Sequence, residues 1–207
     1  MGLTADHLKS SLDAIAAIEP AMAAAIDRAG YPPPRIRERG YATLLRTIVG
    51  QQVSVAAAQS IWTKLEAGLG DLNDPATLAA ISIEEMRGFG LSRQKASYAH
   101  SLAEQVTSGQ LDLQNLSPDD EEAIAALSSV KGIGRWSAEI YLLFAEGRGD
   151  IWPAGDLAVQ IEIGRILGLD ARPTEKATRL LADPWRPHRG AAAIMAWHHY
   201  KVDMAVV

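Results

Sequence analysis

The chain has 207 residues, of which 48% are hydrophobic, and its formal net charge at pH 7 is −5. That length and hydrophobic share are enough to bury a core, which excludes a disordered protein. The sequence contains no cysteine, which excludes disulfides, thiolate catalysis and cysteine-held zinc or iron–sulfur sites. The histidines show no metal-ligand spacing beyond the adjacent pair His198 and His199, so we expect no structural metal and no cofactor.

The sequence also bears on location and partners. No apolar run is long enough to span a bilayer, and residues 1–30 lack the pattern of a signal peptide. We therefore expect an intracellular, cytoplasmic protein with no membrane contact. A pI near 5.5 argues against nucleic-acid binding on the simplest screen. Basic residues predominate within 35–64 and 172–201, which fits either a locally basic face or chance.

Helical periodicity of apolar residues recurs along the chain, and strand patterns are nearly absent. The expected helices are 5–17, 20–29, 42–49, 53–67, 75–80, 92–107, 118–126, 135–145, 157–168, 173–182 and 188–203. Asn73-Asp74-Pro75 and Ser117-Pro118 are typical helix starts. The pattern predicts an all-α fold with two helical lobes and a cleft between them. Lobe A covers about 44–147, and lobe B covers about 1–43 plus 148–207.

Two segments in the first half of the chain lie between expected helices. Residues 47–55 read Thr-Ile-Val-Gly-Gln-Gln-Val-Ser-Val, and their glutamines are either exposed polar residues or interhelical hydrogen-bonders. Residues 86–96 contain Gly88, Gly90 and Ser92, which we interpret as a helix C-cap followed by an N-cap. Arg93 and Lys95 in that segment are candidates for phosphate contacts.

A glycine turn separates the helices expected at 118–126 and 135–145. The segment reads Leu127-Ser-Ser-Val-Lys-Gly-Ile-Gly-Arg-Trp-Ser-Ala-Glu139. Gly132 and Gly134 allow a tight reversal, and bare backbone N–H groups at a helix N-terminus can bind a phosphate. On the glycines alone, an ordinary helix–turn–helix with capping glycines is the simpler interpretation.

The segment Trp152-Pro-Ala-Gly-Asp-Leu-Ala-Val159 places one carboxylate, Asp156, directly before a helical pattern. An aspartate at this point is typical of an N-cap. An N-cap carboxylate accepts backbone N–H bonds, and these favour its charged form. Trp136 follows the glycine turn, and Trp197 lies in the last helix. Each tryptophan either lines a binding pocket or packs in the core.

Three of these segments carry a family resemblance. Leu127–Ala138 resembles the helix-hairpin-helix of the DNA glycosylase superfamily, and Pro153–Asp156 is similar to the Gly/Pro-rich loop that ends in its essential aspartate. Residues 47–55 resemble the Gly-Gln-Gln-(Ile/Val)-Ser segment of the alkylpurine, or 3-methyladenine DNA glycosylase II, group. The resemblance spans roughly residues 44–160, and the Trp197 helix extends it.

The resemblance implies a role for each matched residue. Asp156 is the expected catalytic carboxylate, and Trp136 and Trp197 are the expected base pocket. The expected DNA-binding residues are Gln51, Gln52, Ser54, Lys131, Gly132, Ile133, Gly134 and Arg135, with Gln52 at a wedge position where some relatives have leucine. Ile140 and Leu157 stand where some relatives have tyrosines, which implies a less aromatic pocket.

The activity implied is that of a monofunctional glycosylase, because Trp136 stands where bifunctional members carry a lysine nucleophile. The expected substrate is double-stranded DNA containing 3-methyladenine or 7-methylguanine, flipped out of the helix by a monomer that acts as a single catalytic unit. Two alternatives stay open. One is a helix-hairpin-helix module that binds damaged DNA without turnover, and the other is a bifunctional oxidised-base glycosylase.

Overall fold

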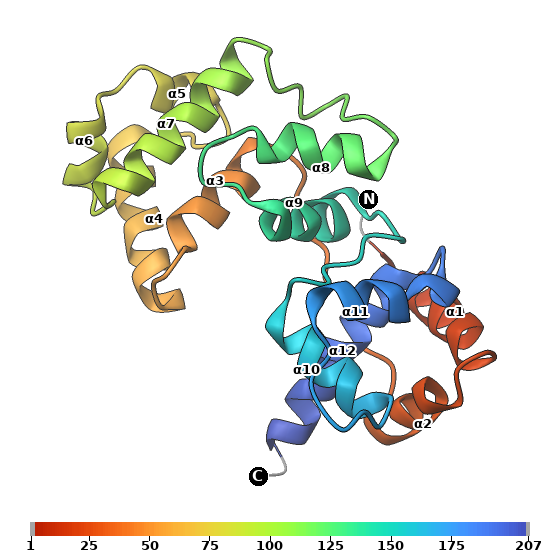
Figure 1. Ribbon diagram of the computed structural model, residues 1–207. Coiled ribbons are helices and arrows are strands. Elements are labelled where there is room, and N and C mark those ends of the chain that lie inside the picture. The colour runs from red at the N-terminus through yellow and green to blue at the C-terminus, as the bar shows by residue number, and fades with distance from the viewer. Residues whose placement is uncertain (1–2, 206–207) are drawn as a thin grey trace. The chain divides into compact units, whose positions relative to one another are not determined.

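The structure, a computed structural model, describes residues 3–205, and the side chains from residue 203 onward are not described. The described residues form helices joined by short loops, with no strand among them (Figure 1). The predicted all-α fold is therefore confirmed. Within the described part of the chain, no helix is long and apolar enough to cross a membrane.

The described residues divide into two compact units. The central unit runs Glu38–Tyr141, and the terminal unit joins the described residues up to Arg37 with those from Leu142 onward. The sequence placed these joins at about 44 and 147, a few residues later in each case. The second join lies between α9, which ends at Tyr141, and a π-helical turn that begins at Leu142. The spacing of apolar residues in the sequence does not predict this change.

The terminal unit contains both ends of the described chain. Its elements are α1 (Ala5–Ala16), α2 (Pro20–Ala29), η1 (Leu142–Glu146), α10 (Leu157–Ile166), α11 (Glu175–Leu181), η2 (Asp183–Trp185) and α12 (Arg189–Ala205). Helix α12 packs against α10, α1 and α2. Its first half contributes a run of small buried residues, Ala191–Ala193 and Ala196. Small side chains let neighbouring helices approach α12 closely, which places it at the centre of this unit.

The central unit is built around α7. Its helices are α3 (Tyr41–Gly50), α4 (Val55–Leu69), α5 (Pro75–Ala79), α6 (Ile83–Gly88), α7 (Arg93–Thr107), α8 (Asp120–Ser128) and α9 (Arg135–Tyr141). Helix α7 packs against α3, α5 and α6, whereas α8 packs against α9. Leu44, Leu65 and Leu102 are fully buried in this unit. Burial of such apolar faces is the main stabilising contribution to a helical unit of this kind.

Local capping explains most of the helix starts. Asp74, Ser92 and Asp156 each accept a backbone N–H of the first turn that follows, as the sequence predicted. The start predicted at residue 118 is wrong: α8 begins at Asp120 because Asp119 is the N-cap. Helix α6 is missing from the expected helices, although the C-cap interpreted at Gly88 and Gly90 implied a helix ending there; its C-cap is Phe89. Its signal is present in the sequence, since Ser82 and Glu85 form a reciprocal capping box.

Candidate active site and nucleic-acid interface

Asp156 stands at the N-terminus of α10. One carboxylate oxygen, Oδ1, accepts the backbone N–H of Val159 at 2.9 Å, so the side chain caps the helix. The carboxylate is half-buried. It therefore combines the predicted N-cap role with partial exposure.

Trp197, on α12, is brought directly to this carboxylate. Its indole Nε1–H donates to the same oxygen, Oδ1 of Asp156, across 3.1 Å. The ring is half-buried, and its centroid lies 5.6 Å from that of Phe144 with the planes tilted by 36°. Asp156 and Trp197 are thus two predicted site residues that the fold joins by a hydrogen bond.

The loop before Asp156 is fixed from both sides. The buried Gln160 side chain turns back from α10 and donates from Nε2 to the carbonyl oxygen of Ala154 at 2.8 Å. At the other end of the loop, Trp152 donates from Nε1 to the carbonyl of Thr178 at 3.0 Å. These bonds hold the backbone that presents Asp156, which is what a preorganised site requires.

The glycine turn between α8 and α9 has the conformation that its sequence predicts. Gly132 has φ +89°, a region that favours glycine, and a side-chain carbon there would overlap the ring of Tyr98. Ile133 is only 3% exposed and its N–H donates to the carbonyl of Val130 at 3.0 Å. Ile133 therefore anchors the turn in the core and can meet DNA only through its backbone.

The turn leaves donors available for a ligand. Within the described residues, the amide N–H groups of Gly132 and Gly134 donate to no internal acceptor. Gly134 is exposed and has no atom within 4 Å of the position that a side-chain carbon would occupy. Lys131 is also exposed and forms no ion pair with the described part of the chain. The glycine turn therefore combines two amide N–H groups, which have no acceptor among the described residues, with one cationic side chain, and such groups bind phosphate.

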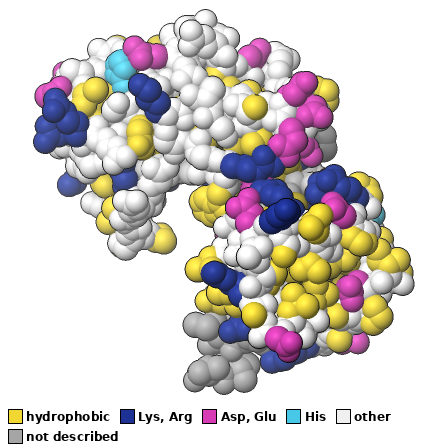
Figure 2. All heavy atoms as spheres, in the orientation of Figure 1, with side chains coloured by type: hydrophobic (Ala, Val, Ile, Leu, Met, Phe, Trp, Pro, Cys, Tyr) yellow, Lys and Arg dark blue, Asp and Glu magenta, His cyan; other side chains and the backbone are white. Residues whose placement is uncertain are grey.

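Arg135, unlike Lys131, forms ion pairs among the described residues. Its NH1 donates to Glu121 at 2.8 Å and its Nε to the buried Glu139 at 2.9 Å. The hydrogen bond to Glu121 is the main cause of its raised pKa. Figure 2 shows the acidic side chains that gather over α8, and Glu121 belongs to that first turn. The guanidinium ties α9 to α8, and contact of Arg135 with DNA stays a prediction.

Trp136 follows on α9 and belongs to the central unit, whereas Asp156 and Trp197 belong to the terminal unit. Its side chain is 46% exposed, which does not fit core packing. Of the two positions where a tyrosine is lacking, Ile140 is buried, but Leu157 is 55% exposed directly beside Asp156 in the chain. Leu157 is therefore available to touch a ligand, and Ile140 is not.

The two adjacent glutamines have opposite environments. Gln51 donates from Nε2 to the carbonyl of Gly132 at 2.7 Å and so links the end of α3 to the glycine turn. Gln52 is exposed at φ +53°, the only non-glycine residue among those described with a positive φ. Such strained residues cluster at functional sites. Ser54 is the N-cap of α4, where it accepts the N–H of Ala57 at 3.2 Å.

Comparison with known proteins identifies the family. The family described as "HhH-GPD superfamily base excision DNA repair protein" matches residues 45–187. The chain belongs to this superfamily. The resemblance inferred from the glycine turn, the Asp156 loop and the glutamine segment is therefore confirmed.

Several HhH-GPD relatives are named for work on alkylated bases. The chain is 31% identical over 180 residues to DNA-3-methyladenine glycosylase 1 of Schizosaccharomyces pombe, with 83% of this chain and 78% of the relative covered. It is 30% identical over 171 residues to the alkylbase DNA glycosidase-like protein of the same yeast, covering 79% of each.

Solved structures of this superfamily have the same fold. A DNA-3-methyladenine glycosidase of Bacillus halodurans gives a TM-score of 0.85 at 28% identity, covering 94% of this chain and 91% of that one. The Schizosaccharomyces pombe 3-methyladenine DNA glycosylase in complex with abasic DNA gives 0.77 at 27% identity, covering 94% and 97%.

Sequence reasoning missed the contacts that two residues of this HhH-GPD protein make. Gln160 was not singled out, because nothing local indicates that its amide turns back to Ala154. Lys95 was considered only as a phosphate contact. Its Nζ instead donates to the carbonyl of Val49 at 2.9 Å, and burial lowers its pKa. Lys95 thus caps the C-terminal end of α3, just before the glutamines, where a cation meets the helix dipole favourably.

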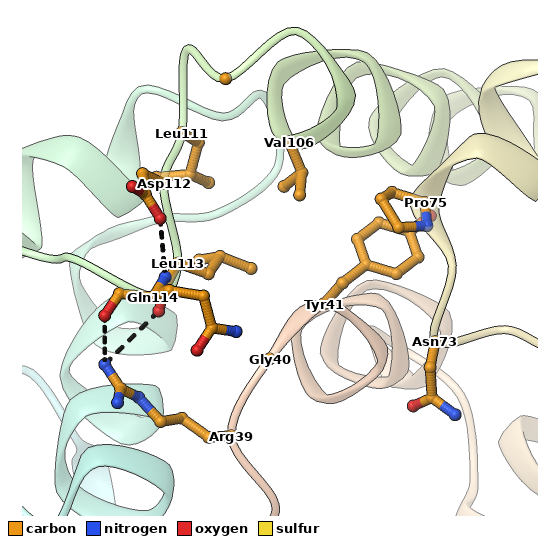
Figure 3. A pocket seen from close by; sticks show the side chains of 11 residues that line it. Arg39, Gly40, Tyr41, Asn73, Pro75, Val106, Leu111, Asp112, Leu113 and Gln114 are labelled. Carbon is orange, nitrogen blue, oxygen red and sulfur yellow. Dashed lines mark hydrogen bonds between the residues drawn. The ribbon is translucent and has the colours of Figure 1, made fainter.

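One cavity in the central unit lies apart from these residues. It has a volume of about 500 Å³ and opens between the start of α3 and the chain that follows α7 (Figure 3). Arg39 at its rim donates to the carbonyl of Gln114 at 3.2 Å. The hydroxyl of Tyr41 is buried without a hydrogen-bond partner, and burial raises the pKa of this side chain. No predicted site residue lines this cavity.

Proposed function

We propose that this protein is a monofunctional DNA glycosylase that hydrolyses the N-glycosidic bond of alkylated purines, such as 3-methyladenine and 7-methylguanine, in double-stranded DNA. The observation that carries the proposal is the Asp156 carboxylate, held at the N-terminus of α10 and hydrogen-bonded by Trp197. The names of the relatives support the substrate class.

The proposed reaction breaks the bond between the sugar C1′ and the base nitrogen. The electron pair of that bond leaves with the base, and positive charge develops on the deoxyribose. The Asp156 carboxylate stabilises that charge electrostatically and orients a water molecule, whose oxygen adds to C1′ while its proton passes to the carboxylate or to solvent. An alkylated base that is already cationic departs as a neutral molecule, so this chemistry requires no strong general acid.

Aromatic faces supply the proposed selectivity. A cationic purine is attracted to the electron-rich face of a tryptophan, by about 0.5–2 kcal/mol depending on how far the pair is desolvated. Trp197 is fixed beside the carboxylate, and Trp136, in the central unit, is about half-exposed. Both tryptophans are proposed to contact the flipped base. The exposed Leu157 replaces an aromatic contact with an aliphatic one.

The central unit is proposed to hold the DNA. The open amides of Gly132 and Gly134, with Lys131 beside them, fit a backbone phosphate. The exposed, strained Gln52 fits the wedge position in the minor groove, where its amide fills the gap by hydrogen bonding. The relative solved with abasic DNA supports DNA as the partner. We expect the protein to bind double-stranded DNA as a monomer.

Hydrolysis by water is the proposed route because Trp136 offers no amine for a Schiff base. Lys131 lies nearby in sequence, but it points to solvent from the glycine turn. Borohydride reduction traps the imine that a lyase mechanism forms between enzyme and DNA. We expect no such covalent adduct, and its appearance would identify the protein as a bifunctional glycosylase.

Base release tests the proposal. A methylated DNA duplex is incubated with the protein, and free 3-methyladenine and 7-methylguanine are quantified. Asp156→Asn should abolish release and retain folding and DNA binding, because asparagine caps a helix about as well as aspartate. Asp74→Asn, which changes another N-cap aspartate, is the matched control and should leave release unchanged. A wild-type protein that binds DNA but releases no base would instead be a non-catalytic binding module.

A further inference from the structure

A buried ionisable pair joins the two helices that carry Asp156 and Trp197. Glu162 on α10 is completely buried, and its Oε1 accepts a hydrogen bond from Nδ1 of His199 on α12 at 2.6 Å. His199 is itself only 5% exposed. The other oxygen of Glu162 accepts from Arg165 at 3.2 Å, whose side chain is half-exposed. No step of the proposed reaction uses this pair.

The chemistry of the pair requires an explanation. Burying a carboxylate is costly, and well-packed apolar residues of similar size often stabilise a protein as much or more. A hydrogen-bonded pair differs from apolar packing because its geometry is directional. A short buried hydrogen bond between two helices can fix one register.

The Glu162–His199 pair lies on the same two helices as Asp156 and Trp197. Glu162 follows Asp156 on α10, and His199 lies two residues beyond Trp197 on α12. The same two helices, which pack directly together (Figure 1), are therefore joined twice, by Glu162–His199 and by Asp156–Trp197. The first bond is buried and the second is half-buried.

We propose that Glu162 and His199 are positioning residues for Asp156, which fix α12 against α10 so that the Trp197 indole holds the carboxylate in its reactive orientation. The inference rests on the proposed function, because it concerns the same carboxylate. Neither residue contacts the reacting atoms. The indole bond is 3.1 Å long, and a helix shift of about 1 Å takes it beyond hydrogen-bonding range.

Single-turnover base release with the full chain tests the proposal. His199→Leu removes the donor, and we expect the rate constant to fall about 10- to 100-fold because the carboxylate is misplaced. Affinity for a duplex containing an abasic-site analogue should stay unchanged. His199→Asn keeps a nitrogen donor near the Nδ1 position and should recover most of the rate. Measurements are made well below each variant's melting temperature.

Arg165→Gln is the matched control. It removes the half-exposed partner of the same carboxylate and leaves the bond to His199 in place. Half-exposed ion pairs contribute little, so the rate should stay within about twofold of wild type. A loss as large as that of His199→Leu would overturn the proposal, since it would show that any disturbance of Glu162 has the same effect.

The indole N–H resonance of Trp197 gives a second measurement that needs no catalysis. Assigned with Trp197→Phe, this signal reports the bond to Asp156. We expect His199→Leu to shift it and speed its exchange with solvent, and His199→Asn and Arg165→Gln to preserve it. If the wild type releases no base, the proposed function fails while this signal still tests the positioning role.

Two further outcomes contradict the positioning role. One is a His199→Leu protein with a lowered melting temperature but an unchanged rate and indole signal, which would make the pair merely structural. If that variant does not fold, Glu162→Gln replaces it, because glutamine keeps the size of the side chain and weakens the bond to His199. An unchanged rate and an unchanged indole signal in Glu162→Gln would overturn the proposal equally.

Discussion

The indole N–H of Trp197 and the backbone N–H of Val159 donate to the same carboxylate oxygen, Oδ1 of Asp156, at 3.1 Å and 2.9 Å. The first donor comes from α12 and the second from α10. Two donors from different helices on one oxygen fix both the position and the plane of the carboxylate. In the proposed reaction, orientation matters because stabilisation of the sugar cation depends on distance and direction.

Trp197→Phe separates the aromatic face from this hydrogen bond. Phenylalanine can still stack on a cationic base, but it cannot donate to Asp156. Hydrogen bonds to charged groups contribute about 1.5–3 kcal/mol, and we expect base release to slow by about tenfold or more. Single-turnover assays on methylated DNA measure this.

Trp62→Phe is the control for that measurement. It also removes an indole hydrogen bond to a carboxylate, that of Glu66 on α4 in the central unit. That loss should lower the melting temperature and leave the rate of base release close to wild type. Equal rates for Trp197→Phe and wild type would show that the indole bond does not contribute to catalysis.

The two glycines of the turn should respond differently to alanine. Gly132→Ala introduces a side chain at φ +89° and against the Tyr98 ring, and we expect it to destabilise the protein by about 1–3 kcal/mol. Gly134→Ala meets no atom within 4 Å and should fold normally. Its methyl group would project where the phosphate is proposed to bind, so DNA affinity should fall.

Urea unfolding and fluorescence anisotropy with labelled duplex distinguish these effects. The expected pattern is a stability loss confined to Gly132→Ala and a binding loss in a fully stable Gly134→Ala. A Gly134→Ala protein that binds DNA like wild type would exclude the turn amides as the phosphate site.

Neighbouring glutamines give a second contrast. Gln51→Leu leaves the carbonyl of Gly132 without its partner, and we expect a loss of stability of about 1–3 kcal/mol. Gln52→Gly relieves the positive φ of an exposed residue and should preserve stability. It should nevertheless slow release of damaged bases from duplex DNA, because the proposed wedge is gone.

Single-stranded substrate provides the control for Gln52. No base has to be extruded from a stack in a single strand, so Gln52→Gly should release bases from it at the wild-type rate. An equal defect on single- and double-stranded substrates would contradict a wedge role.

The parts of this structure that the sequence predicts are local ones. Asp156 as an N-cap, the tight turn at Gly132 and the Ser92 cap all depend on residues within a turn of one another. The all-α fold follows from apolar periodicity, which each helix carries in its own residues. The capping box at Ser82 and Glu85 is equally local, so α6 could have been predicted as well.

The parts that the sequence did not predict depend on contacts between distant segments. Nothing near Gln51 indicates that its amide reaches Gly132, and nothing near Arg135 indicates the bond to Glu121. The pairing of Glu162 with His199 likewise follows only from the packing of α10 on α12. A side chain's residue type can be read locally, but its partner is set by the tertiary fold.

The ion pairs of Arg135 and Arg93 predict a weak dependence of DNA affinity on salt. Arg135 is paired with Glu121 and Arg93 with Glu84, whereas Lys131 is exposed without an ion pair in the described chain. Each neutralised phosphate contributes a slope of about −0.9 in log affinity against log salt, and we expect a total of about −2 to −3.

Lys131→Ala should make that slope shallower by about 1, whereas Lys176→Ala, an equal charge change on α11, should not. A steep wild-type slope that Lys131→Ala leaves unaltered would place the main phosphate contacts elsewhere on the protein.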